Sequence, residues 1–294
     1  MTATVAPTEL AVSSAAERRV LARRILAHHS KSFWWAALLL PEDCRRDAAA
    51  LYAWCRRCDD AADLPDDPEV ARRAVARLRT ELDAIYRDEE PSDPILLGFA
   101  DVVRRHQIPY QHPSDLIDGM AMDLGPVRYQ TFEQLLPYCY RVAGTVGLMM
   151  AHLMGVRDTA TLNHAADLGI AMQLTNICRD VLEDEGRDRI YVPRELCAAD
   201  GPTPESVAEL LRRAEAFYRS GDRGISALPW RCAIAVRAAR LIYSDIGGQL
   251  ARRGFDFRLG RVVVPRRRKL RLALRALRGL PGDLLKRAVA RARR

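Results

Sequence analysis

The sequence has no apolar run long enough to cross a lipid bilayer. Its longest apolar stretch, residues 142–156, spans 15 residues and includes His152, whereas a membrane-spanning helix needs about 20 apolar residues. The N-terminus also lacks a basic region followed by an apolar run, which is the pattern of a secretory signal. We therefore expect a cytoplasmic protein that does not cross a membrane and is at most peripheral at the inner face of the cell membrane.

Cysteine pairing of the kind that stabilises small secreted domains is missing as well. The seven cysteines are an odd number and lie scattered through apolar stretches, which favours reduced thiols. Cys55 and Cys58 have the spacing of a redox or zinc pair, but no second pair and no β-α-β pattern accompanies them. We interpret both as buried helical residues.

Alternation of β-branched residues is scarce, and glycine and proline fall mostly at segment ends. From residue 15 onward Ala, Leu, Arg and Glu dominate, and apolar residues recur at three- and four-residue spacing. Residues 131–134, Thr-Phe-Glu-Gln, form a capping-box sequence that should open a helix. The pattern predicts an all-α fold of nine or ten helices in a single domain, with no credible strand pair.

The net charge of +8 is distributed unevenly. Residues 261–294 contain 13 Lys and Arg and one acidic residue, a net charge of +12, so residues 1–260 carry −4. Such a tail suits nucleic acid, an anionic membrane or an acidic partner. Because no helix-turn-helix, zinc finger or base-stacking aromatic motif accompanies it, we expect no nucleic acid.

Residues 269–278 predict a short basic amphipathic helix. Three leucines share one face and three arginines share another: Leu270, Leu274, Leu277, Arg271, Arg275 and Arg278. This helix either touches anionic lipid or packs on the body of the protein with its arginines solvated. We divide the chain into a flexible N-terminus at residues 1–14, an all-α domain at 15–265 that carries the catalytic candidates below, and this tail at 266–294.

Two predicted helices carry acidic side chains at helical spacing. Asp59 and Asp63 lie four residues apart and project from one face about one turn apart. Asn176, Asp180 and Asp184 form a polar stripe two turns long on a segment whose flanks are apolar. Unpaired carboxylates on a buried helix are costly, so a metal or a cationic partner is expected there.

The chemistry that suits two such faces is the departure of a diphosphate. Mg²⁺ prefers oxygen ligands and bridges carboxylates to phosphate oxygens, and it would stabilise the charge that grows as the C–O bond breaks. Four arginines could clamp the diphosphate, although we expect at least two of them to make only surface ion pairs: Arg56, Arg179, Arg187 and Arg189. By contrast, we interpret the Asp43/Asp47 pair as a solvated face.

Two glycines leave one helix face without side chains within the longest apolar stretch. Gly144 and Gly147 would let a neighbouring helix or a long substrate chain approach closely, and helix packing is the commoner reason for such spacing.

Seven segments in consistent order over residues 20–270 resemble the squalene/phytoene synthase family, most closely its bacterial phytoene synthases. They are His29–Phe33, Tyr52–Asp63, Asp118–Asp123, Tyr138–Gly147, Gln173–Asp184, Arg189–Pro193 and Ala239–Tyr243. The resemblance implies the isoprenoid synthase fold, with a central cavity between the two aspartate-bearing helices. It also implies site residues at matching positions.

The implied Mg²⁺ ligands are Asp59, Asp63, Asn176, Asp180 and Asp184. The implied catalytic residues are Asp59, Asp63, Asp180, Asp184, Arg56 and Tyr243. The implied substrate contacts are His29, Ser30, Lys31, Phe33, Tyr52, Arg56, Tyr140, Gln173, Arg179, Tyr243 and Arg261.

The implied reaction joins two molecules of geranylgeranyl diphosphate head-to-head through prephytoene diphosphate to phytoene. It needs Mg²⁺, or Mn²⁺ in its place, and no NADPH. A squalene-type or dehydrosqualene-type synthase that uses two farnesyl diphosphates would share every metal ligand, and one sequence does not separate the two. The third hypothesis is a non-catalytic helical adaptor, which would have no need of these polar positions.

Overall fold

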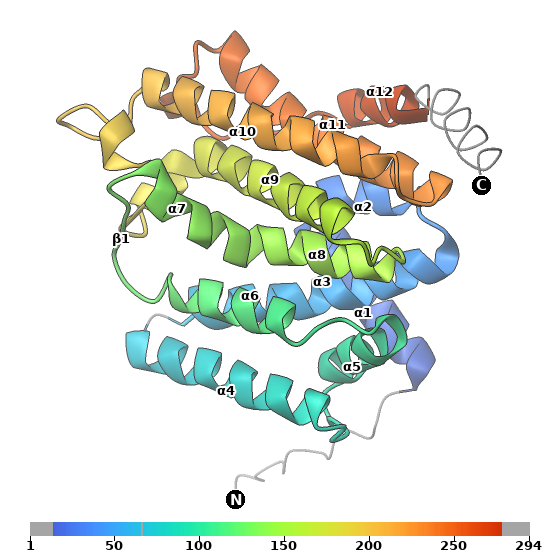
Figure 1. The fold of residues 1–294 in the computed structure, drawn as a ribbon. Coiled ribbons are helices and arrows are strands. Elements are labelled where there is room, and N and C mark those ends of the chain that lie inside the picture. The colour runs from blue at the N-terminus through green and yellow to red at the C-terminus, as the bar shows by residue number, and fades with distance from the viewer. Residues whose placement is uncertain (1–13, 66, 278–294) are drawn as a thin grey trace, which may run out of the picture.

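The computed structural model describes residues 14–65 and 67–277, except for the side chains of Lys31 and Ser32. Almost all of this part of the chain is helical, as the sequence predicts (Figure 1). The elements in order are α1 (Ala15–His29), α2 (Lys31–Ala37), α3 (Glu42–Asp63), α4 (Pro68–Tyr86), α5 (Pro94–His106), α6 (Gln111–Ala121), β1 (Val127–Arg128), α7 (Phe132–Cys139), the π-helix η1 (Tyr140–Gly144), α8 (Thr145–Leu153), α9 (Thr159–Glu185), β2 (Arg189–Ile190), the 3₁₀-helix η2 (Arg194–Leu196), α10 (Pro204–Ile225), α11 (Trp230–Arg252), the 3₁₀-helix η3 (Phe257–Leu259) and α12 (Arg266–Leu277).

Several helices begin at the prolines and polar residues that mark breaks in the sequence. α4, α5 and α10 each have proline in the first turn, preceded by the N-caps Asp67, Asp93 and Thr203, whose side chains accept backbone N–H bonds. Thr131 caps α7 by accepting a bond from the backbone N–H of Gln134. These residues explain why the chain turns where it does.

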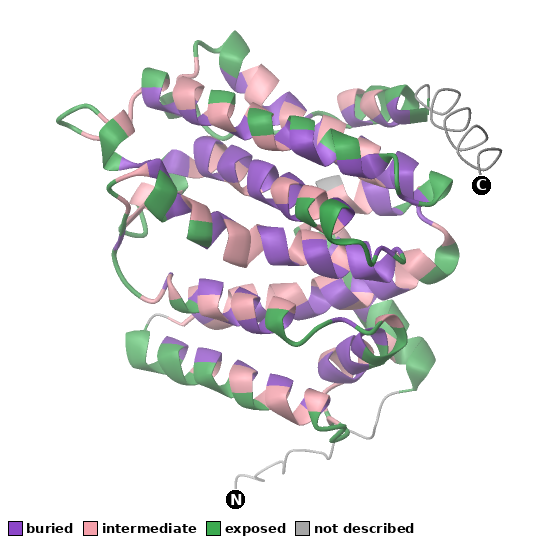
Figure 2. Ribbon diagram, viewed as in Figure 1, coloured by how far each residue is buried: buried purple, intermediate pink, exposed green. Residues whose placement is uncertain are grey.

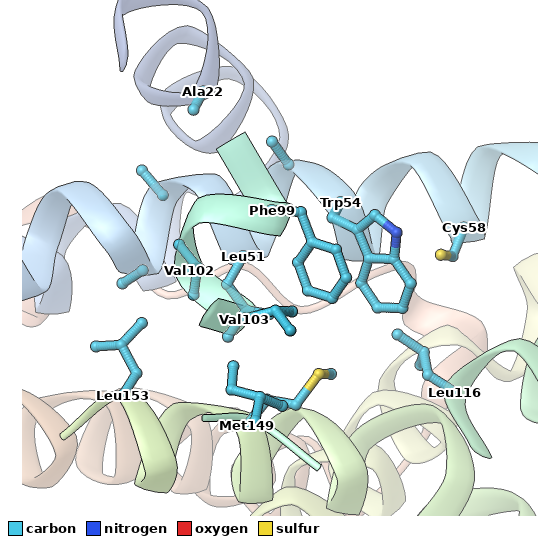
Figure 3. Packing of buried hydrophobic residues seen from close by; sticks show 14 of the residues in the cluster. Ala22, Leu51, Trp54, Cys58, Phe99, Val102, Val103, Leu116, Met149 and Leu153 are labelled. Carbon is cyan, nitrogen blue, oxygen red and sulfur yellow. The ribbon is translucent and has the colours of Figure 1, made fainter. Parts of the chain in front are cut away.

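The helices pack around α9, which runs through the middle of the molecule between α10 and α11 on one side and α8 on the other (Figure 1). Buried residues line the faces that the helices turn toward one another (Figure 2). In the larger buried cluster Trp54 of α3 stacks on Phe99 of α5, with ring centroids 4.1 Å apart (Figure 3). This stacking joins α3 to α5.

Two expectations about the elements are wrong. The described residues form twelve α-helices rather than nine or ten, partly because the side chain of Ser30 accepts the N–H of Phe33 and starts α2 directly after α1. They also contain a parallel two-residue strand pair, in which Val127 lies opposite Arg189. A ladder this short leaves no alternation in the sequence for a pattern to detect.

The interpretation of Asp43 and Asp47 as one solvated face is wrong for Asp47. Asp43 is exposed, but Asp47 is only 4% exposed. Its carboxylate accepts bonds from Arg105, at 2.8 Å, and contacts His106 Nε2 at 2.9 Å. Asp47 also accepts a bond from its neighbour Arg46, at 3.1 Å. It therefore joins the start of α3 to the end of α5, and its two partners on α5 lie almost sixty residues away, where helical spacing gives no information.

The close approach expected at Gly147 serves helix packing. A Cβ built on Gly147 would lie 2.3 Å from the carbonyl oxygen of Ala165, and one on Gly169 would lie 2.2 Å from that of Ala143. α8 and η1 thus pack backbone to backbone against α9 at these points.

The proposed division into three parts remains a prediction. Of the N-terminal segment only Ser14 lies within the described residues, where it caps α1 in a reciprocal capping box with Glu17. Of the tail, residues 266–277 form α12, which packs against α11 and α2. No helix among residues 14–65 and 67–277 is both long and apolar enough to cross a bilayer.

Candidate active site

A cavity of about 390 Å³ lies between α3 and α9 and is closed by parts of α2, α8, α10 and α11. Its lining runs along α9 from Thr161 to Asn176 and along α3 from Ala48 to Asp59. At 1.5 Å per residue, the stretch on α9 is about 22 Å long. Most of the lining is aliphatic, and the carboxylate, amide and guanidinium groups gather at the end formed by Asp59 and Asn176. The cavity is therefore long and mostly apolar, with Thr161 and His164 toward one end and a more polar mouth at the other.

The first predicted aspartate face lies at this mouth, on the last turns of α3. Asp59 lines the cavity and is paired with Arg56 at 2.9 Å. Arg56 also pairs with Asp60 one helical turn on. Asp63 accepts bonds from Arg187 at 3.0 Å and from Arg189 at 2.6 Å.

The second predicted face lies on α9, whose long apolar flanks are buried. Gln173 and Asn176 line the cavity, and Asn176 Nδ2 donates to Gln173 Oε1 at 3.2 Å. One turn further, Asp180 accepts bonds from Arg179 Nε at 2.7 Å and from Arg261 Nε at 2.9 Å. The stripe therefore runs out of the cavity into a cluster of arginines.

Two long-range ion pairs bring these faces together. Arg187 and Arg189 directly follow α9 and its Asp184, yet both bond Asp63 on α3. The residues joined are 124 and 126 positions apart in the sequence. The two acidic stretches thus lie at the same end of the cavity, joined through arginines, although Asp63, Asp180 and Asp184 are not part of its lining.

Burial acts on the carboxylates at this mouth. It raises the pKa of Asp59 to about 6, with help from the like charge of Asp63. Burial, followed by the charge of Asp180, raises the pKa of Asp184 to about 7. Carboxylates that are desolvated and crowded by like charge favour a bound cation.

The oxygen donors at the mouth fit a divalent cation in their chemistry. Asn176 Oδ1 is buried and has no hydrogen-bond partner, so it offers a lone pair toward the cavity. Carboxylate and amide oxygens are the ligands that Mg²⁺ prefers. Among the described residues, however, no three His, Cys, Asp or Glu side chains lie close enough together to hold one metal ion. Arginines stand beside Asp59, Asp63 and Asp180 instead.

Some of the predicted substrate-binding residues line the cavity and others do not. Phe33 is close to both Tyr243 and Tyr52, with ring centroids 5.2 and 6.4 Å apart, and all three rings line the cavity. Arg56 and Gln173 also line it. Five residues are not part of its lining: His29, Ser30, Tyr140, Arg179 and Arg261. The side chain of Lys31 is outside the described residues.

One buried group near the mouth was not among the predicted site residues. Asp123, at the end of α6, accepts bonds from Tyr191 at 2.7 Å and from Tyr138 at 3.0 Å, while its backbone carbonyl accepts from Arg189 at 3.0 Å. Burial raises the pKa of Asp123 to about 6. Asp123 thereby fixes the arginine that holds Asp63. The sequence could have indicated Asp123, because it lies in the Asp118–Asp123 segment that resembles the family.

None of the seven cysteines forms a disulfide. All seven are free thiols, and Cys58 is fully buried in α3 while Cys55 lines the cavity. Burial raises the pKa of Cys55 to about 12. Cys55 is therefore a neutral, largely apolar wall residue.

Comparisons with known proteins agree with this geometry. Residues 26–268 match the model of the squalene/phytoene synthase family. The chain is 41% identical over 247 residues to a phytoene synthase from Pseudescherichia vulneris, covering 77% of this chain and 80% of that protein. It is 34% identical over 288 residues to a 15-cis-phytoene synthase from Synechococcus elongatus, covering 88% and 92%.

A solved structure of a dehydrosqualene synthase in complex with a ligand has a TM-score of 0.83 and 27% identity to this chain, covering 91% of it and 98% of that protein. A squalene synthase from Alicyclobacillus acidocaldarius has a TM-score of 0.72 at 25% identity, covering 81% and 95%. These likenesses confirm the all-α isoprenoid synthase fold. The chain belongs to the squalene/phytoene synthase family.

Proposed function

We propose that this chain condenses two molecules of geranylgeranyl diphosphate to phytoene, the first committed step of carotenoid biosynthesis. The observation that carries the proposal is the meeting of two acidic helices at the polar mouth of a long apolar cavity. The relatives named phytoene synthase, at 41% and 34% identity, support the same reaction.

In the proposed first step, one diphosphate leaves and the C2–C3 double bond of the second substrate attacks the allylic cation. Loss of a proton then closes the cyclopropane ring of prephytoene diphosphate. In the second step its diphosphate leaves, the skeleton rearranges, and loss of another proton gives phytoene. No electrons enter or leave the carbon skeleton from outside, so no NADPH is expected.

The oxygen atoms at the mouth would hold Mg²⁺, or Mn²⁺ in its place. The proposed ligands are Asp59, Asp63, Asn176, Asp180 and Asp184. Bound Mg²⁺ would neutralise the charge that develops on the departing diphosphate. Arginines that now pair with these carboxylates, Arg56, Arg179 and Arg261 among them, would turn to the phosphate oxygens, for which their planar guanidinium groups are suited.

The cavity beyond the mouth would protect the carbocation. Its lining offers few groups that could hold water, and Phe33, Tyr52 and Tyr243 place aromatic rings next to the mouth. Aromatic faces attract cations, and a dry cavity prevents quenching by water. We propose that these rings position the allylic chain and stabilise its positive charge.

The length of the cavity supports the C20 substrate. Its lining along α9 extends about 22 Å from the mouth, which suits an extended geranylgeranyl chain. The second candidate is condensation of two farnesyl diphosphates, which the likeness to a dehydrosqualene synthase structure favours. A non-catalytic adaptor of the same fold is the third and least supported reading.

The test is incubation of the purified protein with Mg²⁺ and either the C15 or the C20 diphosphate, followed by chromatography of the products. We expect phytoene from the C20 substrate. Product from the C15 substrate alone would establish the second candidate, and no product from either would favour the adaptor. Asp59→Asn and Asp180→Asn should each abolish turnover and leave the helix content, measured by circular dichroism, unchanged.

We also propose that the protein works in the cytoplasm in peripheral contact with an anionic membrane, because phytoene is a C40 hydrocarbon that water does not hold. The basic charge of residues 261–294 supports this contact.

A further inference from the structure

The outer face of α12 combines exposed leucines with arginines. Leu270, Leu274 and Leu277 are 48%, 51% and 37% exposed. Three arginines on the same helix are exposed beside them: Arg267, Arg271 and Arg275. We call these six residues the α12 outer face.

The opposite side of α12 is fixed to the protein by smaller groups. Ala273 and Ala276 are buried against the body, and Arg268 donates to both carboxylate oxygens of buried Asp245 on α11, at 2.6 and 2.7 Å. Three of the four leucines of α12 are therefore exposed while its alanines are buried, and only Leu272 packs partly against the body. Exposure of three leucines is the reverse of what burial of apolar area favours. An apolar surface that covers the exposed leucines would remove them from water and stabilise this arrangement.

Further exposed apolar side chains lie around the same corner of the molecule. Leu38, at the end of α2, is 41% exposed, and Trp230, at the start of α11, is 51% exposed. Ile234, one helical turn after Trp230, lies in a buried cluster with Ala276 of α12, and Leu39, next to Leu38, packs against that cluster. α2, α11 and α12 thus join at this corner, as Figure 1 also shows.

This corner adjoins the apolar end of the cavity. Leu40 and Leu228 line the cavity, and each is two residues from an exposed apolar residue, Leu38 and Trp230. The aspartates lie at the other end of α3 and α9. A surface docked here would face the hydrocarbon end of the cavity and leave the diphosphate end in water.

The positive charge of α12 favours an anionic partner for this surface. Residues 266–277 contain six basic residues and no acidic one. A second copy would bring two such helices together, and residues 278–294, whose sequence carries a net charge of +5, would meet the same repulsion. An anionic lipid bilayer offers both an apolar layer for leucines and negative headgroups for arginines.

We infer that the α12 outer face, with Leu38 and Trp230 beside it, docks on an anionic lipid bilayer and holds the apolar end of the cavity against the membrane. The inference rests on the peripheral contact proposed above and names the surface that makes it. In this orientation a hydrocarbon product would travel the shortest way into lipid, while diphosphate and metal ions exchange with water at the opposite end.

The test is co-sedimentation of the full chain with vesicles of phosphatidylglycerol and phosphatidylcholine, and with vesicles of phosphatidylcholine alone. We expect binding to the anionic vesicles, weakened by salt. The leucine variant (Leu270→Ser, Leu274→Ser, Leu277→Ser) and the arginine variant (Arg267→Gln, Arg271→Gln, Arg275→Gln) should each lower the affinity about tenfold or more.

The control variants make the same kinds of substitution on another part of the surface. Arg72→Gln, Arg73→Gln and Arg77→Gln remove three exposed arginines from α4, and Leu64→Ser with Val70→Ser removes exposed apolar groups. Both controls should bind as the unaltered chain does. Unchanged binding of the α12 variants would overturn the inference, as would loss of all binding on deletion of residues 278–294 alone. A concentration-dependent dimer that the leucine variant abolishes, without vesicle binding, would also overturn it.

Phytoene synthesis measured in detergent micelles separates this inference from the proposed function. Both α12 variants should keep full activity there. Failure of vesicle binding with intact synthesis would reject only the docking surface.

Discussion

At the scale of single residues, Asp184 carries a proton in the folded protein that it would not carry in the unfolded chain. Burial and Asp180 raise its pKa from an ordinary value of 3.8 to about 7. Between about pH 4 and pH 7 the folded state therefore binds the extra proton, and stability falls as pH rises through that window. Above pH 7 the ionised Asp184 side chain lowers the free energy of unfolding of the metal-free protein.

The first prediction follows from this sign. Without divalent ions, Asp184→Asn should raise the free energy of unfolding at pH 8 by about 1–2 kcal/mol, after allowance for solvent screening. This gain in the free energy of unfolding should shrink toward zero below pH 4. The Asp184→Asn variant should also lose turnover. Denaturant unfolding in EDTA at both pH values measures it. Asp200→Asn, at an exposed position, is the control, and an equal gain at both pH values would contradict the explanation.

The second prediction concerns Asp123. Tyr191→Phe removes the donor 2.7 Å from a carboxylate that is only 8% exposed. We expect a loss of about 1–3 kcal/mol in the free energy of unfolding, because a buried acceptor loses a partner. Tyr129→Phe is the matched control, since Tyr129 belongs to the same aromatic group but makes no hydrogen bond to Asp123 in the described structure. Both variants keep the aromatic ring, so equal losses would mean that the hydrogen bond to Asp123 is not the cause.

Residue types and spacing predicted the acidic side chains, but the sequence could not predict their partners. Asp59 and Asp63 were identifiable because a helix places residues four apart on one face. The same spacing gave the wrong environment for Asp47, whose partners Arg105 and His106 come from another helix. Tyr140 was expected to contact substrate, yet its ring lies outside the cavity lining. Contacts between elements are set by packing, which periodicity does not encode.

At the scale of elements, the caps and breaks were the predictable part, because they depend on neighbouring residues. The Thr131 cap and the prolines that open α4, α5 and α10 act within a single turn. The outward direction of the leucines on α12 was not predictable, because the sequence showed that they share a face but not which side of the helix meets α11.

The third prediction concerns the packing of α8 on α9. Gly147→Ala should cost about 2–3 kcal/mol of stability, because its Cβ would lie 2.3 Å from the Ala165 carbonyl and force the helices apart. Gly98→Ala is the control, since its Cβ would meet Ala50 at an ordinary 3.6 Å and alanine favours helix. Thermal unfolding compares the two. A neutral Gly147→Ala would mean that the helices move apart at little cost.

At the scale of the whole molecule, the site depends on joining distant parts of the chain. The family pattern predicted that residues 59–63 and 176–184 share a site, but not that the segment after α9 crosses to α3. The strand pair β1–β2, the carbonyl of Asp123 and the guanidinium of Arg189 together make that crossing. None of these contacts produces a recognisable pattern in the local sequence, because each joins residues that are tens of positions apart.

The last prediction tests this connection by a double-mutant cycle on Asp63 and Arg189. The two side chains are only 21% and 12% exposed and lie 2.6 Å apart. Asp63→Asn leaves the Arg189 charge without this carboxylate, and Arg189→Gln leaves Asp63 with only the more exposed Arg187. Asp63→Asn, Arg189→Gln and the double variant, unfolded in EDTA, should give a coupling energy of about 1–3 kcal/mol. The matched pair is Glu209 and Arg212 on α10, which is far more exposed and should couple by less than about 0.5 kcal/mol. A coupling no larger than that of the exposed pair would mean that α3 and the segment after α9 are held together by other contacts, and that Arg189 is free to leave Asp63 without cost when a diphosphate binds.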